Sequence, residues 1–243
     1  MWRYYYLIGI NLFGFAGMIQ KMRKMAADDT CSEKERYEYL RYTVRVMQKK
    51  GYTCTEVFGA ENLPDEGGYV MYPNHQGKYD AYGIVGVHEK PCTVVMDKAK
   101  SYDLFIKQVI DMIKGKRLDK EDVRQAFGVM NEIAEEVARG RRYIIFPEGE
   151  YDKEKKNTLR DFKAGCFKTS LKSKTPIVPV TLIDSYKAWN SSIIGTVTTQ
   201  VHFLKPIFYD EYKGMKTGEI AAMVRARIQE KLNEILKTEV VVQ

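Results

Sequence analysis

Residues 68–88 read GYVMYPNHQGKYDAYGIVGVH, and this stretch decides how the rest of the sequence is interpreted. It opens with an apolar run, residues 69–73, which predicts a β-strand that ends at Pro73. A helical pattern begins near Tyr79, so the chain passes from strand to helix through a short polar connection. Sheets of α/β proteins place their binding and catalytic groups on such connections. The stretch therefore predicts one strand–helix unit of an α/β fold, with a candidate site between the two elements.

The same alternation continues through the rest of the chain. Further strands are predicted at residues 92–96, 142–146, 177–183 and 197–204. Helices are predicted at residues 79–88, 101–113, 121–139 and 216–236. Strands that alternate with helices of this length predict an α/β fold, here a mixed sheet flanked by helices.

Two of these helices carry apolar residues at three- and four-residue steps, a spacing that predicts a face turned toward the core. In the helix at residues 121–139 the apolar stripe consists of Val123, Phe127, Met130, Ile133 and Val137. In the helix at residues 216–236 it consists of Ile220, Val224, Ile228, Leu232 and Ile235.

The N-terminal segment has a different composition. No charged residue lies between Arg3 and Lys21, and the front of this stretch carries the aromatic residues Trp2, Tyr4, Tyr5 and Tyr6. Such rings settle at lipid–water interfaces, and the basic residues that follow suit anionic headgroups. The stretch is slightly shorter than the ~20 residues of a spanning helix, which favours a membrane anchor or an interfacial helix. A buried core helix and a cleaved signal peptide, which fits less well, are the alternatives.

A second N-terminal helix is predicted at residues 33–50, where Gly51 ends the pattern. The two helices together predict a membrane-associating unit over residues 1–52, followed by a catalytic domain over residues 53–243. The four cysteines are scattered and form no C-x-x-C pair, which indicates a reducing compartment. We therefore expect a membrane-associated protein on the cytoplasmic face.

The composition is that of a globular protein with a moderate basic excess. Of the 243 residues, 44% are hydrophobic and 29% are charged, and the formal net charge is +7. The excess indicates an anionic partner: nucleic acid, an acidic membrane face or a phosphorylated substrate. No basic helix or aromatic platform favours nucleic acid. Metal-ligand spacings, nucleotide-binding glycine loops and the G-x-S-x-G motif are also missing, so the sequence predicts neither a metal site nor a serine nucleophile.

His75 and Asp80 are the candidate catalytic residues of the first connection. Five residues along a continuous helix would separate the two side chains by about 140°. They can pair only if the chain turns between them, and Gly77 makes such a turn easy. A paired carboxylate would fix the imidazole tautomer, and the imidazole could then accept a proton from a hydroxyl. A surface histidine near an unrelated aspartate is the alternative.

Two further segments supply candidate binding residues. The strand at residues 142–146 breaks at a Pro–Glu–Gly turn, where Glu148 could accept a hydrogen bond from a substrate hydroxyl. The basic segment at residues 116–120 and the later residues Arg160 and Lys163 could hold a phosphate near strand ends, with arginine the better bidentate partner. A solvated charged face is the alternative for these cations.

Taken in order, these segments resemble the glycerolipid acyltransferase family, in particular bacterial-type 1-acyl-sn-glycerol-3-phosphate (lysophosphatidic acid) acyltransferases. Residues 74–80, NHQGKYD, resemble the family's N-H-x-x-x-x-D block, and residues 146–149, FPEG, resemble its F-P-E-G block. Residues 162–165, FKAG, and 176–180, PIVPV, are similar to the two later blocks. The resemblance covers roughly residues 55–210.

The resemblance implies a direct acyl transfer. His75, oriented by Asp80, would deprotonate the free hydroxyl of a lysophospholipid, and this hydroxyl would attack an acyl thioester to give phosphatidic acid. The donor would be a thioester of acyl carrier protein or of coenzyme A. Neither a metal nor another cofactor would be needed, and the N-terminal helices would dock the enzyme on the membrane that holds the acceptor.

The resemblance also implies which residues bind the acceptor. Glu148 and Gly149 would help to bind it, and Lys120, Arg117 and Lys163 would hold its phosphate.

The sequence departs from the family pattern in two places. The block that normally ends in I-D-R reads Leu118-Asp119-Lys120 here, with Arg117 as a candidate substitute for the missing arginine. The F-P-E-G block normally continues with T-R-S, but here Glu150-Tyr151-Asp152 puts acidic residues beside the expected phosphate site. The same chemistry on a different lysolipid or alcohol is therefore an alternative, and a membrane-binding module without turnover is another.

Overall fold

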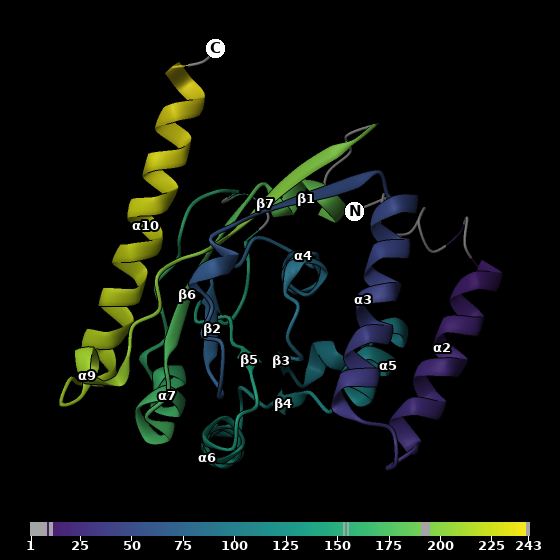
Figure 1. Ribbon diagram of the computed structural model, residues 1–243, viewed down its shortest axis with the longest axis horizontal. Coiled ribbons are helices and arrows are strands. Elements are labelled where there is room, and N and C mark those ends of the chain that lie inside the picture. Colours follow the sequence, from purple (N-terminus) through teal and green to yellow (C-terminus); the bar gives the residue numbers. More distant parts are fainter. Residues whose placement is uncertain (1–8, 10–11, 153, 155, 191–194, 242–243) are drawn as a thin grey trace.

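The computed structural model describes residues 9, 12–152, 154, 156–190 and 195–241. Its centre is a seven-stranded sheet with the strand order β1-β7-β6-β2-β5-β3-β4 (Figure 1). Neighbouring strands run parallel except β6 and β7, which are antiparallel, so the sheet is mixed as predicted. The strands are β1 (Thr53–Phe58), β2 (Val70–Pro73), β3 (Thr93–Asp97), β4 (Lys116–Leu118), β5 (Tyr143–Ile144), β6 (Ile177–Ile183) and β7 (Val197–Phe203).

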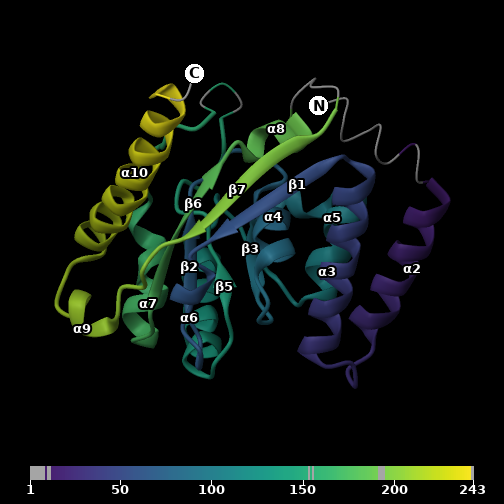
Figure 2. The same cartoon turned by 45° about the horizontal axis from the view of Figure 1, so that its top comes forward.

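Helices cover both faces of the sheet, which lies between them (Figures 1 and 2). One face is covered by α2 (Leu12–Ala27), α3 (Glu33–Lys50), α4 (Asp80–Val87), α5 (Leu104–Met112) and α8 (Ser185–Asn190). The other is covered by α6 (Val123–Ala138), α7 (Lys168–Ser173), α9 (Tyr209–Tyr212) and α10 (Thr217–Val241). Short 3-10 turns are η1 (Ala60–Asn62), η2 (Ala99–Tyr102) and η3 (Ala164–Phe167).

Each face of the sheet has its own buried cluster. The alternation of side chains along β2 divides them, because Met71 belongs to the first cluster whereas Val70 and Tyr72 belong to the second. The predicted stripe of α10 closes the second cluster, with four of its residues fully buried: Ile220, Val224, Ile228 and Leu232. The predicted α/β fold with a mixed sheet flanked by helices is therefore confirmed.

The predicted helix at residues 33–50 is confirmed as α3 with the same bounds. A capping box begins it: the hydroxyl of Ser32 accepts the N–H of Glu35, and the Glu35 carboxylate accepts the N–H of Ser32. Gly51 follows as the cap at the other end. Its apolar side packs into the first cluster through Tyr37, Leu40, Val44 and Met47.

The described part of the N-terminal segment packs on the rest of the protein. Phe15 of α2 contacts Phe105 of α5 with ring centroids 5.1 Å apart, and Met22 is fully buried. The predicted aromatic front, Trp2 and residues 4–6, lies outside the described residues. Along the part of the chain that the structure describes, no helix combines the length and the apolar character needed to cross a bilayer.

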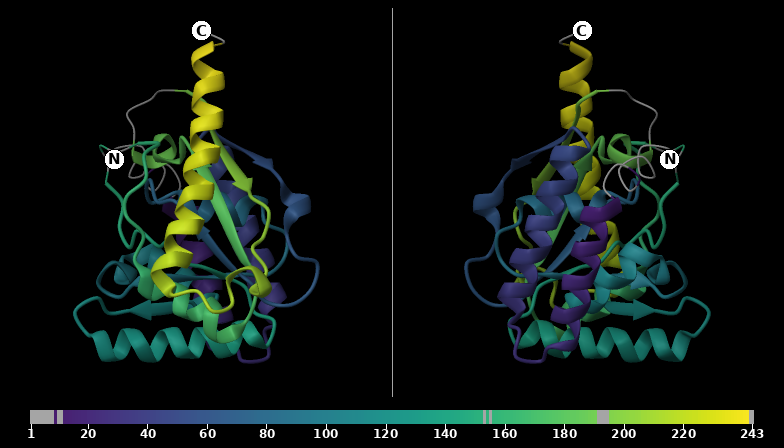
Figure 3. Two further views of the ribbon diagram at one scale, coloured as in Figure 1. Left: turned by 90° about the vertical axis from the view of Figure 1, so that its left-hand side faces the viewer. Right: turned by 90° about the vertical axis from the view of Figure 1, so that its right-hand side faces the viewer.

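The structure corrects the prediction for α6. Its apolar stripe was expected to face the core over its whole length, but Val123 is 80% exposed and Phe127 is 56% exposed. Only the second half of the helix, at Ile133 and Val137, is fully buried. Figure 3 shows α6 lying across the bottom of the molecule, while α10 runs along one face and extends beyond the sheet at the other end.

Several short elements were not predicted: β1, β4, α7, α8 and α9. β1 was missed because it is an edge strand with mostly exposed side chains, so it lacks the alternation of a half-buried strand. The remaining four are too short to carry a periodic signal.

Candidate active site

The connection between β2 and α4 brings His75 and Asp80 into contact. The chain turns between them, with the backbone N–H of Asp80 3.4 Å from the carbonyl of Gly77. Nδ1 of His75 lies 2.7 Å from Oδ2 of Asp80. The predicted pairing is therefore confirmed, and the two are not unrelated loop residues. The catalytic role of the pair stays a prediction.

The carboxylate of Asp80 is fully buried and accepts four hydrogen bonds. Besides His75, Oδ2 accepts the backbone N–H groups of Gln76 at 2.5 Å and Gly77 at 2.9 Å. Oδ1 accepts the hydroxyl of Ser185 at 2.5 Å. Because a carboxylate only accepts hydrogen bonds, Nδ1–H of His75 donates to Oδ2, and in a neutral imidazole Nε2 then has the lone pair that could accept a proton.

Neighbouring rings hold the imidazole of His75 in position. It stacks on Phe146 with centroids 4.2 Å apart and meets the edge of Tyr151 at 5.0 Å. The other two histidines lie elsewhere: burial lowers the pKa of His88 to about 3 and that of His202 to about 4. Neither lines the cavity beside His75.

Two positioning residues of the turn were not predicted. Asn74 is fully buried, and its side chain accepts the N–H of Leu182 at 2.7 Å and donates to its carbonyl at 3.0 Å. Gln76 donates to the same carbonyl at 2.8 Å. These bonds hold the turn against β6, just beyond the last backbone pair of β2 and β6, which is Pro73 with Val180. The only sequence signal for this role was the pair of amide side chains on either side of His75. Their common partner, Leu182, lies 108 positions away from Asn74, so the sequence did not reveal it.

The structure places Glu148 behind the wall of the site. The side chain is 3% exposed, and its two oxygens accept the backbone N–H groups of His75 at 2.9 Å and Arg160 at 3.1 Å. Burial raises the pKa of Glu148 above its ordinary value, although both N–H donors oppose this effect. We expected Glu148 to bind a substrate hydroxyl. Its placement does not favour such a contact, because the carboxylate is buried and both oxygens already accept backbone N–H groups. It instead ties His75 to the segment at Arg160.

Gly149 and Lys163 lie together at the turn after β5. Gly149 has φ +76°, in the left-handed region, and a Cβ there would lie 2.9 Å from Nζ of Lys163. The backbone N–H of Lys163 donates to the carbonyl of Pro147 at 2.8 Å, which fixes the two segments against each other. Both residues line the same cavity as His75, as expected for neighbours of one site.

Arg117 of β4 and Lys120, two residues after the strand, lie in different surroundings. Lys120 lines the cavity, where Nζ lies 2.8 Å from Oδ2 of Asp97. Arg117 does not: its guanidinium donates to Asp111 at 2.6 Å and to Ser101 at 2.9 Å, beside a separate groove next to α2. Side chains alternate along a strand, so Arg117 faces away from its neighbour Leu118, which lines the cavity. This placement does not favour Arg117 as the substitute for the family's arginine.

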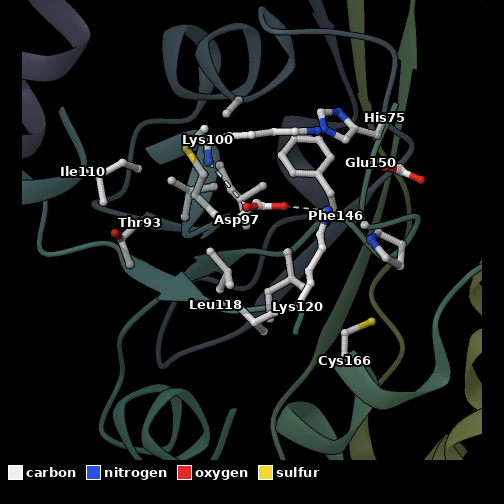
Figure 4. Close-up of a pocket in the computed structure, with 18 of the residues that line it drawn as sticks. His75, Thr93, Asp97, Lys100, Ile110, Leu118, Lys120, Phe146, Glu150 and Cys166 are labelled. Carbon is white, nitrogen blue, oxygen red and sulfur yellow. Dashed lines mark hydrogen bonds and ion pairs between the residues drawn. The ribbon is translucent and has the colours of Figure 1, made fainter. Parts of the chain in front are cut away.

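A deep cavity of about 630 Å³ opens beside His75 (Figure 4). Its inner wall is apolar and buried, and consists of Leu40, Val85, Cys92, Val109, Ile110, Ile113 and Ile144. Its polar residues include Lys100, Lys120, Glu150 and Lys163. The volume lies within the range of ~300–1,000 Å³ of small-molecule pockets. The arrangement can take up an apolar chain and present the group at its end to the imidazole.

The described residues contain no cluster of three or more histidine, cysteine, aspartate or glutamate side chains placed to hold a metal ion. Both cysteines in the interior have pKa values raised by burial, that of Cys92 to about 12. Neither is therefore an activated thiolate in this structure.

An imidazole–carboxylate pair beside a deep apolar cavity, at the end of a strand in an α/β sheet, is an arrangement that suits acyl transfer. The sequence profile of the Acyltransferase family matches residues 54–183, slightly more than half of the chain. The chain belongs to this family.

Its relatives carry more specific names. A 1-acyl-sn-glycerol-3-phosphate acyltransferase of Saccharomyces cerevisiae is 29% identical over 183 residues, which cover 74% of this chain and 60% of the yeast protein. Enzymes with the same name from Salmonella typhimurium and Escherichia coli are 25% identical over 185 residues, which cover 76% of this chain and 74% of each relative. The chain thus spans less than two thirds of the yeast relative and about three quarters of the bacterial ones.

A solved structure shares the whole fold. The crystal structure of the 1-acyl-sn-glycerophosphate (LPA) acyltransferase PlsC from Thermotoga maritima matches with a TM-score of 0.74. The match covers 96% of this chain and 93% of that one at 17% identity. It therefore includes the N-terminal helices as well as the sheet.

Proposed function

We propose that this protein transfers a fatty acyl group from an acyl thioester to the free hydroxyl of 1-acyl-sn-glycerol-3-phosphate, giving phosphatidic acid. The observation that carries the proposal is the contact of 2.7 Å between His75 and Asp80 beside the apolar cavity. The names of the relatives support the choice of acceptor.

In the proposed mechanism the imidazole of His75 acts as a general base. Asp80 holds Nδ1–H, so Nε2 faces the acceptor and takes the proton of its hydroxyl. The hydroxyl oxygen attacks the thioester carbonyl and forms the new ester bond. The carbon–sulfur bond breaks, and the leaving thiolate takes the proton from the imidazolium. No group changes its oxidation state in these steps, and no acyl-enzyme intermediate forms.

The remaining site residues are assigned by their positions. Glu148 acts as a positioning residue, because its carboxylate holds the backbone of His75. The backbone at Gly149 lies in the pocket wall, where it can contact the acceptor. Lys163 and Lys120 line the same cavity and supply the positive charge for the acceptor phosphate.

The proposal also includes the acyl donor and the membrane surface at which the enzyme works. The donor is an acyl thioester of acyl carrier protein or of coenzyme A. The acceptor is an insoluble lipid, so the enzyme works at a membrane surface, on the cytoplasmic face, with residues 1–52 as its membrane-associating unit. The exposed side chains of α2 include Lys21, Arg23 and Lys24, which suit an anionic headgroup layer.

A larger side chain deep in the cavity is expected to shorten the acyl chain that the enzyme prefers. Val109 lines the cavity and is 5% exposed, so Val109→Phe fills space without changing the rim. We expect kcat/KM for a long-chain donor such as palmitoyl-CoA to fall about tenfold, while a decanoyl donor is less affected. An equal loss for both donors, at an unchanged melting temperature, would contradict the assignment of the cavity to the acyl chain.

The proposed function is tested with the purified full chain, lysophosphatidic acid and a radiolabelled acyl donor on each carrier. We expect the label to appear in phosphatidic acid with at least one carrier. Label found only in free fatty acid would show a thioesterase instead, and an unused donor would show a binding module without turnover.

A further inference from the structure

The cavity contains a carboxylate next to one of its lysines. Asp97 ends β3 and Lys120 follows β4, and both line the cavity, with Nζ of Lys120 2.8 Å from Oδ2 of Asp97 (Figure 4). The register of the sheet brings the two segments together, because Asp97 lies opposite Leu118, two residues before Lys120. The two side chains are 18% and 28% exposed, so solvent screens the pair only in part.

The carboxylate of Asp97 is held in place independently of Lys120. Its Oδ1 accepts the backbone N–H groups of Ala99 at 2.9 Å and of Lys100 at 3.4 Å, which leaves Oδ2 to face Lys120. Burial on its own would raise the pKa of Asp97, but Lys120 and the backbone donors outweigh it and hold the pKa below its ordinary value. The cavity therefore contains a fixed negative charge beside a cation proposed to bind phosphate.

We propose that Asp97 determines the charge selectivity of the acceptor site by competing with the acceptor phosphate for Lys120. The inference rests on the proposed function, since it concerns the phosphate of that acceptor. A phosphate that contacts Lys120 also lies close to Asp97, and two negative charges repel more strongly in a partly buried pocket than in water. Asp97 thus weakens binding of a phosphomonoester relative to an acceptor that carries no phosphate.

The lysine at position 120 makes this competition stronger than an arginine would. A guanidinium presents five N–H donors in a planar fork, so it can hold a carboxylate on one edge and a phosphate on another. An ammonium is a compact point charge, and the contact with Asp97 already offsets it. The other two carboxylates that line the cavity pair with different cations: Glu150 lies 3.4 Å from Arg160, and Asp103 lies 3.8 Å from Lys78. Asp97 is the carboxylate in contact with Lys120.

The test compares two acceptors in the full-length protein. Asp97→Asn removes the charge but keeps the side-chain shape and the oxygen that accepts the N–H of Ala99. We expect its KM for lysophosphatidic acid to fall at least about tenfold, because the repulsion between the carboxylate and the phosphate is gone. Its kcat and its KM for monoacylglycerol, which lacks the phosphate, remain at the wild-type values.

Two further variants separate this effect from others. Asp119→Asn removes the same charge next to Lys120 in the sequence, but Asp119 pairs with Lys98 at 3.1 Å and does not line the cavity. It is expected to behave as wild type with both acceptors. Lys120→Arg is expected to lower the KM for lysophosphatidic acid while Asp97 is still present, since the forked guanidinium can hold both anions.

A KM for lysophosphatidic acid that stays unchanged or rises in Asp97→Asn overturns the proposal. An equal change with both acceptors also overturns it, because Asp97 would then only shape the cavity. If Asp97→Asn does not fold, Lys120→Arg decides, and an unchanged KM in that variant is the negative result. Failure of the wild type to acylate lysophosphatidic acid contradicts the proposed function instead, so the two failures are distinguishable.

Discussion

His75→Ala is expected to lower kcat about 10²–10⁴-fold, the usual contribution of a general base. His75 lines the cavity, and its Nδ1 is held by Asp80. Steady-state acyl transfer to lysophosphatidic acid at saturating donor measures the loss. The binding of both substrates should change much less than kcat.

The matched control for this variant is His202→Gln. His202 is buried, stacks on Phe58 at 4.4 Å and lies outside the cavity, so its loss tests whether removing an imidazole away from the site slows the enzyme. We expect wild-type kcat in the control. A His75→Ala variant that keeps more than a tenth of the wild-type kcat, at an unchanged melting temperature, would contradict the assigned role.

Asp80→Asn is expected to lower kcat by up to about 10⁴-fold, the loss that the same substitution causes in the unrelated Ser-His-Asp triad. Oδ2 of Asp80 also accepts the N–H groups of Gln76 and Gly77, so the amide oxygen of asparagine is expected at that position and the amide nitrogen beside Ser185. The neutral side chain then no longer stabilises the imidazolium that forms when His75 takes the proton of the acceptor hydroxyl. The measurement is the same kcat assay.

Ser185→Ala provides the comparison for this second variant. It removes the hydroxyl that donates to Oδ1 of Asp80 at 2.5 Å but leaves the carboxylate and its contact with His75 intact. The loss of one hydrogen bond to a charged group predicts a decrease of about 10–100-fold at most. If Ser185→Ala slowed the enzyme as much as Asp80→Asn, Asp80 would act through the surrounding fold rather than through its charge beside the imidazole.

The His75–Asp80 contact could be predicted from the sequence because it is local. Both residues and the flexible Gly77 lie on one connection whose strand and helix have clear periodic signals. Glu148 could be recognised only as a carboxylate at a strand end. Its function in the structure depends on backbone N–H groups 73 and 12 positions away, and the sequence carries no signal for such partners.

The placement of the basic residues could not be predicted for a related reason. β4 has three residues, too few for a periodic pattern, so the alternation that turns Arg117 away from Leu118 and the cavity could not be recognised. The acidic partner of Lys120 comes from β3, and only the register of the two strands brings it close.

The cavity itself was also hidden in the sequence. Periodicity shows that a helix has an apolar face, but it does not show whether that face meets other side chains or an open pocket. Phe127 of α6 and Ile110 of α5 have the spacing of core residues, and both line the cavity. Residues that line a pocket for an acyl chain therefore have the same sequence pattern as core residues, and only the assembled structure distinguishes the two.

The most direct test of the central claim is the kcat of the double variant His75→Ala/Asp80→Asn, measured beside the two single variants. If the carboxylate acts on the reaction only through the imidazole, the double variant should be no slower than His75→Ala alone, because groups that act as a unit are not additive. Losses that multiply in the double variant would show that Asp80 and His75 contribute independently, and would contradict the account.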